Sequence, residues 1–237
     1  MNVVITGASK GIGKAIAAAF AAQQATLYIC ARNEAALQTT AAELEAGYPG
    51  CRVYYRAADL SDKQAAIAFG QWCLRQGVPD ILVNNAGFFL PGSVYNEAEG
   101  NLEQLMATNL YSAYHLTRSL LPAMMQEGAG TGAARHIFNI CSVASLQAYP
   151  NGGAYSISKF ALMGFSKNLR EELQPHGIKV TAVYPGAVLS DSWKGFDNSN
   201  GRIMEAADVA AMIAAASRLS PQAVVEDIVL RPQLGDL

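Results

Sequence analysis

Short apolar runs alternate with longer amphipathic stretches along the whole chain. Runs of β-branched and apolar residues, typical of buried strands, lie at 2–6, 26–31, 51–57, 79–84, 135–142, 178–184 and 224–231. Helical patterns fill the intervals, at 12–23, 34–46, 62–76, 99–127, 153–174 and 205–217. Strands that alternate with helices join through right-handed crossovers, which place helices on both faces of a parallel sheet. The pattern therefore predicts an α/β fold with a doubly wound, seven-stranded, mostly parallel sheet.

No repeat, low-complexity tract or linker divides this alternation, so we expect one domain over residues 1–237. The least regular stretch, 187–203, is rich in Gly, Asn, Ser and Asp and indicates a surface loop. Because it follows the carboxyl end of a predicted strand, it lies where open α/β sheets bind ligands. We expect it to be a substrate-binding loop.

Composition and charge exclude several classes of protein. Seventeen Lys and Arg against 19 Asp and Glu give a net charge of −2, which offers no general attraction to nucleic acid or to an anionic membrane. The longest apolar runs, 15–22 and 209–216, are much shorter than the roughly 18 residues that a membrane helix needs. No basic signal segment opens the chain, and its four cysteines form no C-x-x-C pair, so we expect a cytoplasmic protein without a disulfide framework or metal site.

The first predicted strand runs into a glycine-rich turn, Thr6–Gly13, and a helix follows at once. Glycines let the backbone turn tightly and approach a ligand, and the helix N-terminus presents unpaired N–H groups to an anion. The spacing is G-x-x-x-G-x-G, which differs from the generic dinucleotide fingerprint G-x-G-x-x-G. The turn favours dinucleotide binding, and an ordinary strand–helix turn that needs glycine only for its geometry is the alternative.

The end of the second predicted strand bears on which dinucleotide binds. An acidic residue at this point suits the ribose hydroxyl of NAD, whereas Arg suits the 2′-phosphate of NADP. Here the strand leads to Ala31-Arg32-Asn33, and Glu34 already belongs to the next helix. Arg32 could bind the phosphate in a fork, and Lys10 could add a second positive charge. Two solvated surface cations are the alternative, but their placement favours NADP.

Tyr155 and Lys159 are four residues apart, so they share one face of a predicted helix. A free phenol has a pKa near 10, and a neighbouring cation lowers it towards the range useful for acid–base chemistry. Ser142, at the end of the fifth predicted strand, precedes Tyr155 by enough residues for the two hydroxyls to converge above the sheet edge. A surface contact and a loop hydrogen bond are the alternatives for these residues. Cys141 lacks a convincing His or Asn partner and is interpreted as strand core.

Asn109 lies on the apolar stripe of the predicted helix 99–127, three residues after Met106. A buried amide needs hydrogen-bond partners. The sequence leaves open whether Asn109 makes an ordinary core hydrogen bond or supports a site.

Taken together, these residues resemble the short-chain dehydrogenase/reductase family. The resemblance rests on Thr6–Gly13, Asn84-Asn85-Ala86-Gly87, Asn109, Ser142, Tyr155-x-x-x-Lys159 and Pro185-Gly186. Each motif is weak alone, but the motifs stand in the family's order and cover nearly the whole chain. The resemblance implies a Rossmann fold and an NADP-dependent enzyme that transfers hydride between a nicotinamide and a carbonyl or alcohol carbon.

The roles that the family assigns would pass to the matching positions. Tyr155 would give a proton to the carbonyl oxygen and Ser142 would orient that oxygen. Lys159 would lower the Tyr155 pKa and bind the nicotinamide ribose, and Asn109 would hold a water that links Lys159 to solvent. The implied cofactor-binding residues are Gly7, Ser9, Lys10, Gly11, Ile12, Gly13, Arg32, Asp59, Leu60, Asn84, Ala86, Gly87, Tyr155, Lys159, Pro185, Gly186, Val188 and Ser190. Ser190 stands where the family commonly has Thr.

The tail, 224–232, and the short loop after Pro185-Gly186 look most like bacterial sepiapterin reductases or 3-oxoacyl-carrier-protein reductases. The resulting hypothesis is an NADPH-dependent carbonyl reductase for a small or medium apolar ketone, with aromatic candidates for the pocket at Phe88, Phe89, Tyr149, Trp193 and Phe196, and with Gln147 beside them. A catalytically silent nucleotide sensor on the same fold is one alternative, which the intact Ser, Tyr, Lys and Asn set disfavours. An NAD-linked alcohol dehydrogenase is the other, which Arg32 disfavours.

The predicted helices 99–127 and 153–174 carry more apolar residues than one sheet face needs. In the resembled family these helices pair between subunits, and closed symmetry is the common outcome. We therefore expect a homodimer or homotetramer. Besides its own subunits, we expect the protein to bind a small carbonyl or alcohol substrate.

Overall fold

The computed structural model, which describes residues 1–126, 135–189, 193 and 195–236, contains one seven-stranded sheet. Its order is β3-β2-β1-β4-β5-β6-β7, and every neighbouring pair is parallel. The strands are β1 (Asn2–Thr6), β2 (Thr26–Ala31), β3 (Arg52–Ala57), β4 (Ile81–Asn84), β5 (His136–Ile140), β6 (Lys179–Pro185) and β7 (Asp227–Leu230). The predicted doubly wound α/β sheet is confirmed, and it is parallel throughout.

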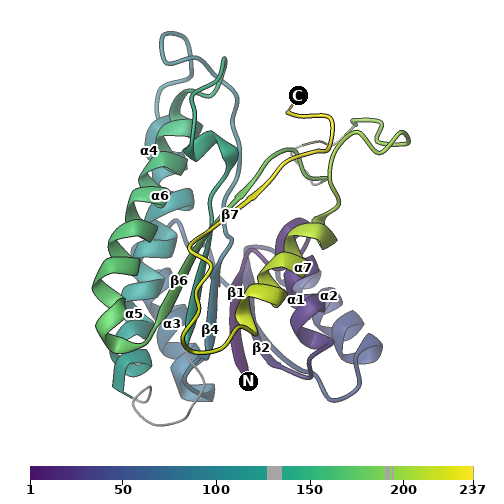
Figure 1. The fold of residues 1–237 in the computed structure, drawn as a ribbon, viewed down its shortest axis with the longest axis vertical. Coiled ribbons are helices and arrows are strands. Elements are labelled where there is room, and N and C mark those ends of the chain that lie inside the picture. The colour runs from purple at the N-terminus through teal and green to yellow at the C-terminus, as the bar shows by residue number, and fades with distance from the viewer. Residues whose placement is uncertain (127–134, 190–192, 194, 237) are drawn as a thin grey trace.

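Helices cover both faces of the sheet (Figure 1). One face packs against α1 (Gly11–Ala21), α2 (Glu34–Gly47) and α7 (Ala206–Ser217), and the other against α3 (Lys63–Gln76), α5 (Ser112–Gln126) and α6 (Gly153–Leu173). The side chains of successive strand residues point to opposite faces of the sheet. Val3 and Ile5 belong to the hydrophobic core on the face that α1, α2 and α7 cover, and Val4 belongs to the core on the other face. The continuous apolar runs of the strands follow from this two-sided burial.

Capping side chains set where two of these helices begin. The Asn33 side chain accepts a hydrogen bond from the Ala36 N–H at 2.9 Å, and the Asp62 side chain accepts one from the Ala65 N–H at 2.7 Å. Such caps satisfy N–H groups that have no partner within the helix. Each cap follows a strand, so α2 and α3 start close to the carboxyl edge of the sheet.

The predicted helix 99–127 is helical from Asn101 to Gln126, but it is not a regular α-helix throughout. The structure divides it into α4 (Asn101–Met106), a π-helical turn (Ala107–Tyr111) and α5, which contains Pro122. Asn109 lies in the π-turn, and its side chain bonds to the backbone of Phe88 and to Ser158, contacts that a pattern of apolar residues does not encode. The fifth strand also ends earlier than predicted, at Ile140, so Ser142 lies beyond it and caps a short 3₁₀ turn (Val143–Ser145).

Because all strands are parallel, their carboxyl ends meet at one edge of the sheet. The chain order reverses between β1 and β4, since β2 and β3 extend the sheet to one side and β5, β6 and β7 to the other. Ligands of open α/β sheets bind at such a switch point. Within the described residues, no helix is long and apolar enough to cross a membrane.

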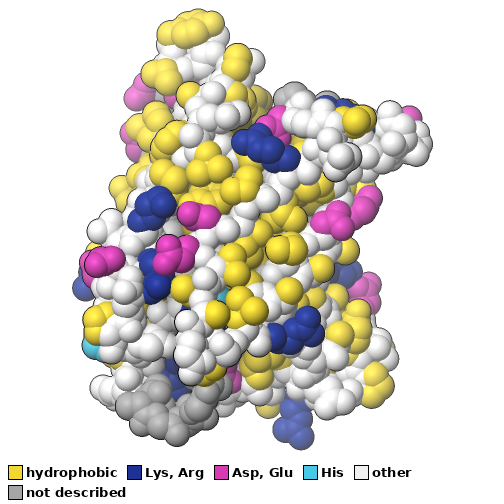
Figure 2. All heavy atoms as spheres, viewed as in Figure 1, with side chains coloured by type: hydrophobic (Ala, Val, Ile, Leu, Met, Phe, Trp, Pro, Cys, Tyr) yellow, Lys and Arg dark blue, Asp and Glu magenta, His cyan; other side chains and the backbone are white. Residues whose placement is uncertain are grey.

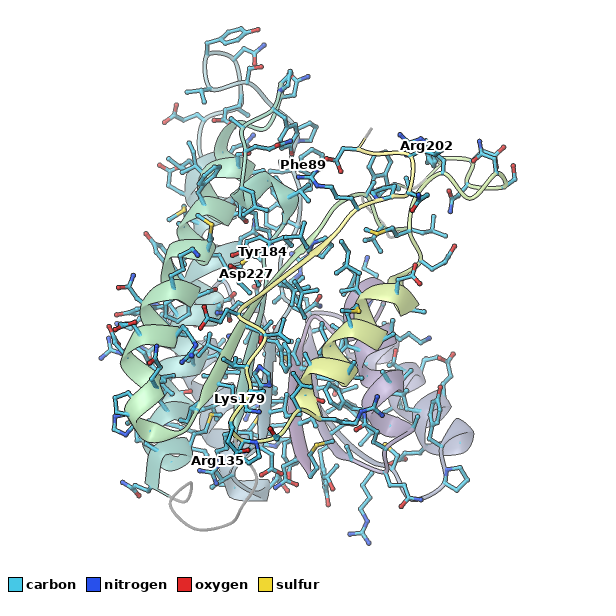
Figure 3. The ribbon with its side chains drawn as sticks, viewed as in Figure 1. Phe89, Arg135, Lys179, Tyr184, Arg202 and Asp227 are labelled. Atoms are coloured by element: carbon cyan, nitrogen blue, oxygen red, sulfur yellow. The ribbon has the colours of Figure 1, made fainter. Side chains whose placement is uncertain are left out.

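The opposite end of the sheet holds a buried basic cluster of Arg135, His136 and Lys179. Figure 3 labels Arg135 and Lys179 at this end. His136 is 1% exposed and shares a 2.7 Å hydrogen bond between its Nε2 and Thr181 Oγ1, and its Nδ1 has no partner among the described residues. Lys179 donates to the carbonyl oxygens of Leu219 and Ser220. Burial, and then the charge of Lys179, lowers the pKa of His136 to about 3.

This cluster predicts that the protein loses stability in mild acid. The pKa of His136 is 6.5 when unperturbed and about 3 in the fold, so the unfolded chain binds a proton that the folded chain rejects. Stability therefore falls as pH drops below about 6.5, by about 2 kcal/mol between pH 7 and pH 5 from this group. His136→Gln should remove that part of the loss in urea unfolding at the two pH values. His176→Gln, at an exposed histidine, is the control, and an unchanged pH dependence in the His136 variant would contradict the assignment.

Candidate active site

A cavity of about 700 Å³ opens at the carboxyl edge of the sheet. The turn after β1 and the end of β2 line one end, and the segment after β5 and the first turns of α6 line the other. The segments after β4 and β6 lie between them. The cavity therefore occupies the switch point of the sheet, where the sequence motifs converge.

The glycine turn brings the N-terminus of α1 to the cavity wall. Ser9, Lys10, Gly11 and Ile12 line the cavity, and the first turn of α1 contains no acidic residue that would occupy its N–H groups. A Cβ atom added to Gly13 would lie 2.3 Å from the Gly7 carbonyl oxygen, so only glycine lets α1 approach β1 this closely. This arrangement can bind a phosphate group through backbone N–H groups and the helix dipole.

The segment after β4 is tied to the glycine turn through Thr6 and Asn85. Thr6 Oγ1 accepts hydrogen bonds from the N–H groups of Asn85 and Ala86, at 2.9 and 2.8 Å. Asn85 Nδ2 donates to the carbonyl oxygens of Thr6 and Gly7, at 2.9 and 3.1 Å. Asn85 belongs to the Asn-Asn-Ala-Gly motif that the sequence analysis singled out, and it lines the cavity.

Lys10 and Arg32 are both exposed and both line the end of the cavity beside β2. Asp59 and Leu60, which follow β3, line the same end. Hydrogen bonds from Ser61 lower the pKa of Asp59, and the charge of Arg32 lowers it further. This end therefore combines two cations with one well-ionised carboxylate, which can distinguish a phosphate from a hydroxyl by charge.

Ser142, Tyr155 and Lys159 meet at the other end, where all three line the cavity. Burial raises the pKa of Tyr155 to about 12, and a hydrogen bond with Ser142 opposes that shift. Lys159 donates to the Ile140 carbonyl oxygen at 2.9 Å, and burial lowers its pKa to about 8. Its Nζ lies 5.9 Å from the centre of the Tyr155 ring.

The expectation that Lys159 lowers the pKa of Tyr155 stays a prediction, because the net shift in this structure is upward. The Tyr155 pKa rises, because burial of the phenol outweighs its hydrogen bond with Ser142. The ammonium group of Lys159 is itself desolvated and directed at the Ile140 carbonyl. The phenol is therefore fully protonated at neutral pH.

Asn109 lies behind this group and does not line the cavity. Its Oδ1 accepts from the Phe88 N–H at 2.9 Å, and its Nδ2 donates to the Phe88 carbonyl at 3.1 Å and to Ser158 Oγ at 2.9 Å. A Cβ added to Gly87 would lie 3.0 Å from Asn109 Oδ1 and 3.5 Å from Lys159 Nζ. Gly87 thus separates the two side chains without filling the space between them.

Most of the other predicted residues also lie at the cavity, and two need comment. Asn84 does not line it, because the side chain is buried on the α5 side and donates to Thr117 and Asn139 at 2.9 and 2.8 Å. Ser190 lies outside the described residues. The predicted residues that do line the cavity are Gly7, Ser9, Lys10, Gly11, Ile12, Gly13, Arg32, Asp59, Leu60, Ala86, Gly87, Ser142, Tyr155, Lys159, Pro185, Gly186 and Val188.

Aromatic side chains form much of the wall near Tyr155. Phe89 packs edge-to-face on the Tyr155 ring, with centroids 4.9 Å apart, and Figure 3 shows it above the carboxyl ends of the strands. Phe88, Tyr149 and Trp193 also line the cavity, together with Gln147. Phe196 does not, but its ring packs against Trp193.

Cys141 and the tail complete this end. Burial raises the pKa of the Cys141 thiol to about 11, so it is neutral, as expected of a core residue.

The sequence analysis missed Asp236, which lines the cavity, forms an ion pair with Arg231 and lies close to Gly186. Arg202 donates to the carbonyl oxygens of Gly235 and Asp236, which ties the 187–203 loop to the tail.

Sequence comparisons agree with this geometry. Residues 1–200 match the family model for short chain dehydrogenases. The chain is 33% identical to a sepiapterin reductase of Chlorobaculum tepidum, across 99% of this chain and 97% of that protein. It is 35% identical to the ketoacyl reductase HetN of Nostoc across 79% of this chain, but it spans only 63% of that longer protein.

Solved structures agree as well. An alcohol dehydrogenase from the archaeon Thermococcus sibiricus, complexed with 5-hydroxy-NADP, is similar with a TM-score of 0.89 and 25% identity, over 100% of this chain and 98% of that one. A metagenomic short-chain oxidoreductase in complex with NADP has a TM-score of 0.83 and 31% identity, over 98% and 97%. The L-sorbose reductase of Gluconobacter frateurii, solved with NADPH and L-sorbose, has a TM-score of 0.86 and 26% identity, over 97% and 94%. The motifs, the fold and these matches together place the chain in the short-chain dehydrogenase/reductase family of oxidoreductases.

Proposed function

We propose that this enzyme uses NADPH to reduce a ketone to an alcohol, with Tyr155 as the proton donor. The observation that carries the proposal is the meeting of Ser142, Tyr155 and Lys159 in the same cavity as the glycine turn and Arg32. A cavity of about 700 Å³ has room for a cofactor and a small substrate together.

NADP(H) is the cofactor, and the residues around the cavity fit it. The N-terminus of α1 would hold the pyrophosphate, and Arg32 and Lys10 would hold the 2′-phosphate of the adenosine ribose. Asp59 and Leu60 would flank the adenine, and Pro185 and Gly186 the nicotinamide. When bound there, the dihydronicotinamide supplies the hydride for the carbonyl carbon.

The protein supplies the proton and the orientation. Tyr155 is protonated at neutral pH, because its pKa is about 12, and so it can give a proton to the oxygen of the forming alkoxide. Ser142 would donate a hydrogen bond to the same oxygen and fix its position. Lys159, whose pKa is about 8, can bind the cofactor ribose and return a proton towards Tyr155 after each turnover. Asn109 would hold the adjoining water near Gly87.

The substrate pocket favours an apolar ketone of small or medium size. Phe88, Phe89, Tyr149 and Trp193 form its wall, and Ala187 and Val188, at the start of the predicted substrate-binding loop, line it too. The similar proteins are named for sepiapterin, ketoacyl and L-sorbose reduction, which share carbonyl reduction and differ in substrate. A panel of acetophenone, benzil, diacetyl, a pterin ketone and a 3-oxoacyl thioester, each assayed by loss of NADPH absorbance, would identify the substrate class.

Tyr155→Phe should lower kcat on the best panel ketone by about 100-fold or more, the size expected from loss of a general acid. The ring is retained, so the NADPH Kd should change little. Tyr149→Phe removes a phenolic hydroxyl from the same cavity and is the matched control. Near-normal turnover in the Tyr155 variant would contradict the mechanism.

Cofactor choice should depend on the two cations beside β2. Charge-assisted contacts to the 2′-phosphate should make kcat/KM about 100-fold or more higher with NADPH than with NADH. Arg32→Asp should abolish this preference because it removes a donor and repels the phosphate. Lys10→Ala should reduce it less, since a flexible ammonium group commits less to one geometry than a guanidinium group does.

The control for cofactor choice is Arg56→Asp. This substitution changes the net charge by the same amount as Arg32→Asp does. Arg56 lies at an exposed position on β3, outside the cavity. Equal use of NADH and NADPH by the unaltered enzyme would show that Lys10 and Arg32 are ordinary surface cations.

The exposed apolar side chains predict self-association. Leu102, Tyr111, Tyr114, Ile157 and Phe160 lie exposed on the segment from α4 to α6. Apolar side chains also gather over the β7 edge between α6 and α7 (Figure 2), where Val229 is 51% exposed. Light scattering at micromolar concentration should therefore give a dimer or tetramer of the 25.1 kDa chain, and Phe160→Glu should shift it to smaller species. A purely monomeric protein would count against this.

A further inference from the structure

The segment between β4 and α4 crosses the start of α6, the helix that carries Tyr155. The Gly92 N–H donates to the Asn151 carbonyl oxygen at 3.0 Å, and Ser93 Oγ bonds to Asn151 Oδ1 at 3.0 Å. Phe89, from the same segment, packs on the Tyr155 ring. This segment therefore contacts the helix both just before its first turn and at the phenol itself.

Glu97 makes the contact at the first turn. Its Oε2 accepts a hydrogen bond from the N–H of Ala154 at 3.2 Å. The residue that precedes the helix, Gly152, has no side chain that could do this. A carboxylate at this end also interacts favourably with the helix dipole. The N-terminal cap of α6 thus comes from a residue far away in the chain.

The segment that contains Gly92 and Glu97 packs so closely against the first turn of α6 that neither can move without displacing the other. A Cβ added to Gly153 would lie 2.3 Å from the Gly92 carbonyl oxygen and 2.9 Å from Glu97 Oε2. A Cβ added to Gly92 would lie 2.7 Å from Glu97 Cβ. Gly153 also has φ +30°, a conformation that side chains disfavour. The first turn of α6 is therefore packed directly against the backbone that carries Glu97.

We propose that Glu97 is a positioning residue for ketone reduction, which fixes the first turn of α6 and so the placement of the Tyr155 phenol. The inference rests on the proposed role of Tyr155. Tyr155 follows Ala154 directly, so a shift of the capped N–H is passed to the phenol through one residue. Glu97 does not line the cavity and acts through Ala154, next to Tyr155. Lys159, which would hold the cofactor ribose, lies a full turn further along α6, so the effect falls mainly on proton transfer.

Two substitutions separate the reach of the side chain from its charge. Glu97→Gln keeps an oxygen at the same distance from the backbone and loses the charge. Glu97→Asp keeps the charge, but its side chain is one carbon shorter and cannot reach the Ala154 N–H, which Glu97 Oε2 contacts at 3.2 Å. Glu99→Asp, at an exposed position two residues further on, is the matched control. Each variant is assayed for kcat on the best panel ketone, for NADPH Kd by fluorescence titration and for Tm.

Glu97→Asp should lower kcat about tenfold while the NADPH Kd stays within about twofold, and Glu97→Gln should keep kcat within about threefold of the unaltered enzyme. Glu99→Asp should change neither value. Equal kcat values for Glu97→Asp and Glu99→Asp would overturn the inference. A Gln variant as slow as the Asp variant, or an NADPH Kd that weakens in step with kcat, would overturn it too.

Tyr155→Phe, measured in the same series, separates this inference from the proposed function. Normal turnover in Tyr155→Phe would remove the proposed function itself. If Tyr155→Phe has no turnover and Glu97→Asp is fully active, the result contradicts only the positioning role of Glu97. Where Asp lowers the Tm, kcat is compared at a temperature well below that Tm, so that unfolding does not account for the lost turnover.

Discussion

The parallel direction of all seven strands is the constraint on which the site depends. It brings the carboxyl ends of the strands to one edge and places residues from remote parts of the chain around one cavity. The hydrogen bonds that join Thr6 to Asn85 and Ala86 then hold the first and fourth strand ends together at the switch point. The glycine turn and the Tyr155 helix are positioned on either side of that junction.

Burial and charge compete within this cavity, and burial prevails at Tyr155. A phenol with a pKa of about 12 carries its proton throughout the working range of pH, although the raised pKa also makes it a weaker acid than a free phenol. Lys159, with a pKa of about 8, is closer to the working range of pH. This division favours the reducing direction, in which the phenol begins the cycle with its proton in place.

Local patterns predicted much of this structure and only part of the site. Strands β1 and β2 begin and end where the apolar runs do, because two-sided burial leaves a continuous signal. Tyr155 and Lys159 could be paired from their spacing on one helix. The π-turn at Asn109 could not be found in this way, because Asn109 bonds there to the distant Phe88 backbone, a contact that no local pattern encodes. Asn84 was misplaced for the same reason, since its partners Thr117 and Asn139 lie on other elements. Asp236 was missed because nothing in the tail's composition indicates that it returns to the cavity.

The π-turn between α4 and α5 has a consequence for how this region can change in length. Each residue turns an α-helix by about 100°, so the extra residue of a π-turn rotates everything before it relative to everything after it. Asn109 turns inward there while Leu105 and Leu116, on either side, remain in the core. Loss of one residue from Ala107–Tyr111 would let a regular helix form and would rotate one of those leucines away. A one-residue deletion here would therefore alter two layers of packing at once, whereas deletions in the exposed segment around Val94 and Tyr95 would leave both layers in place.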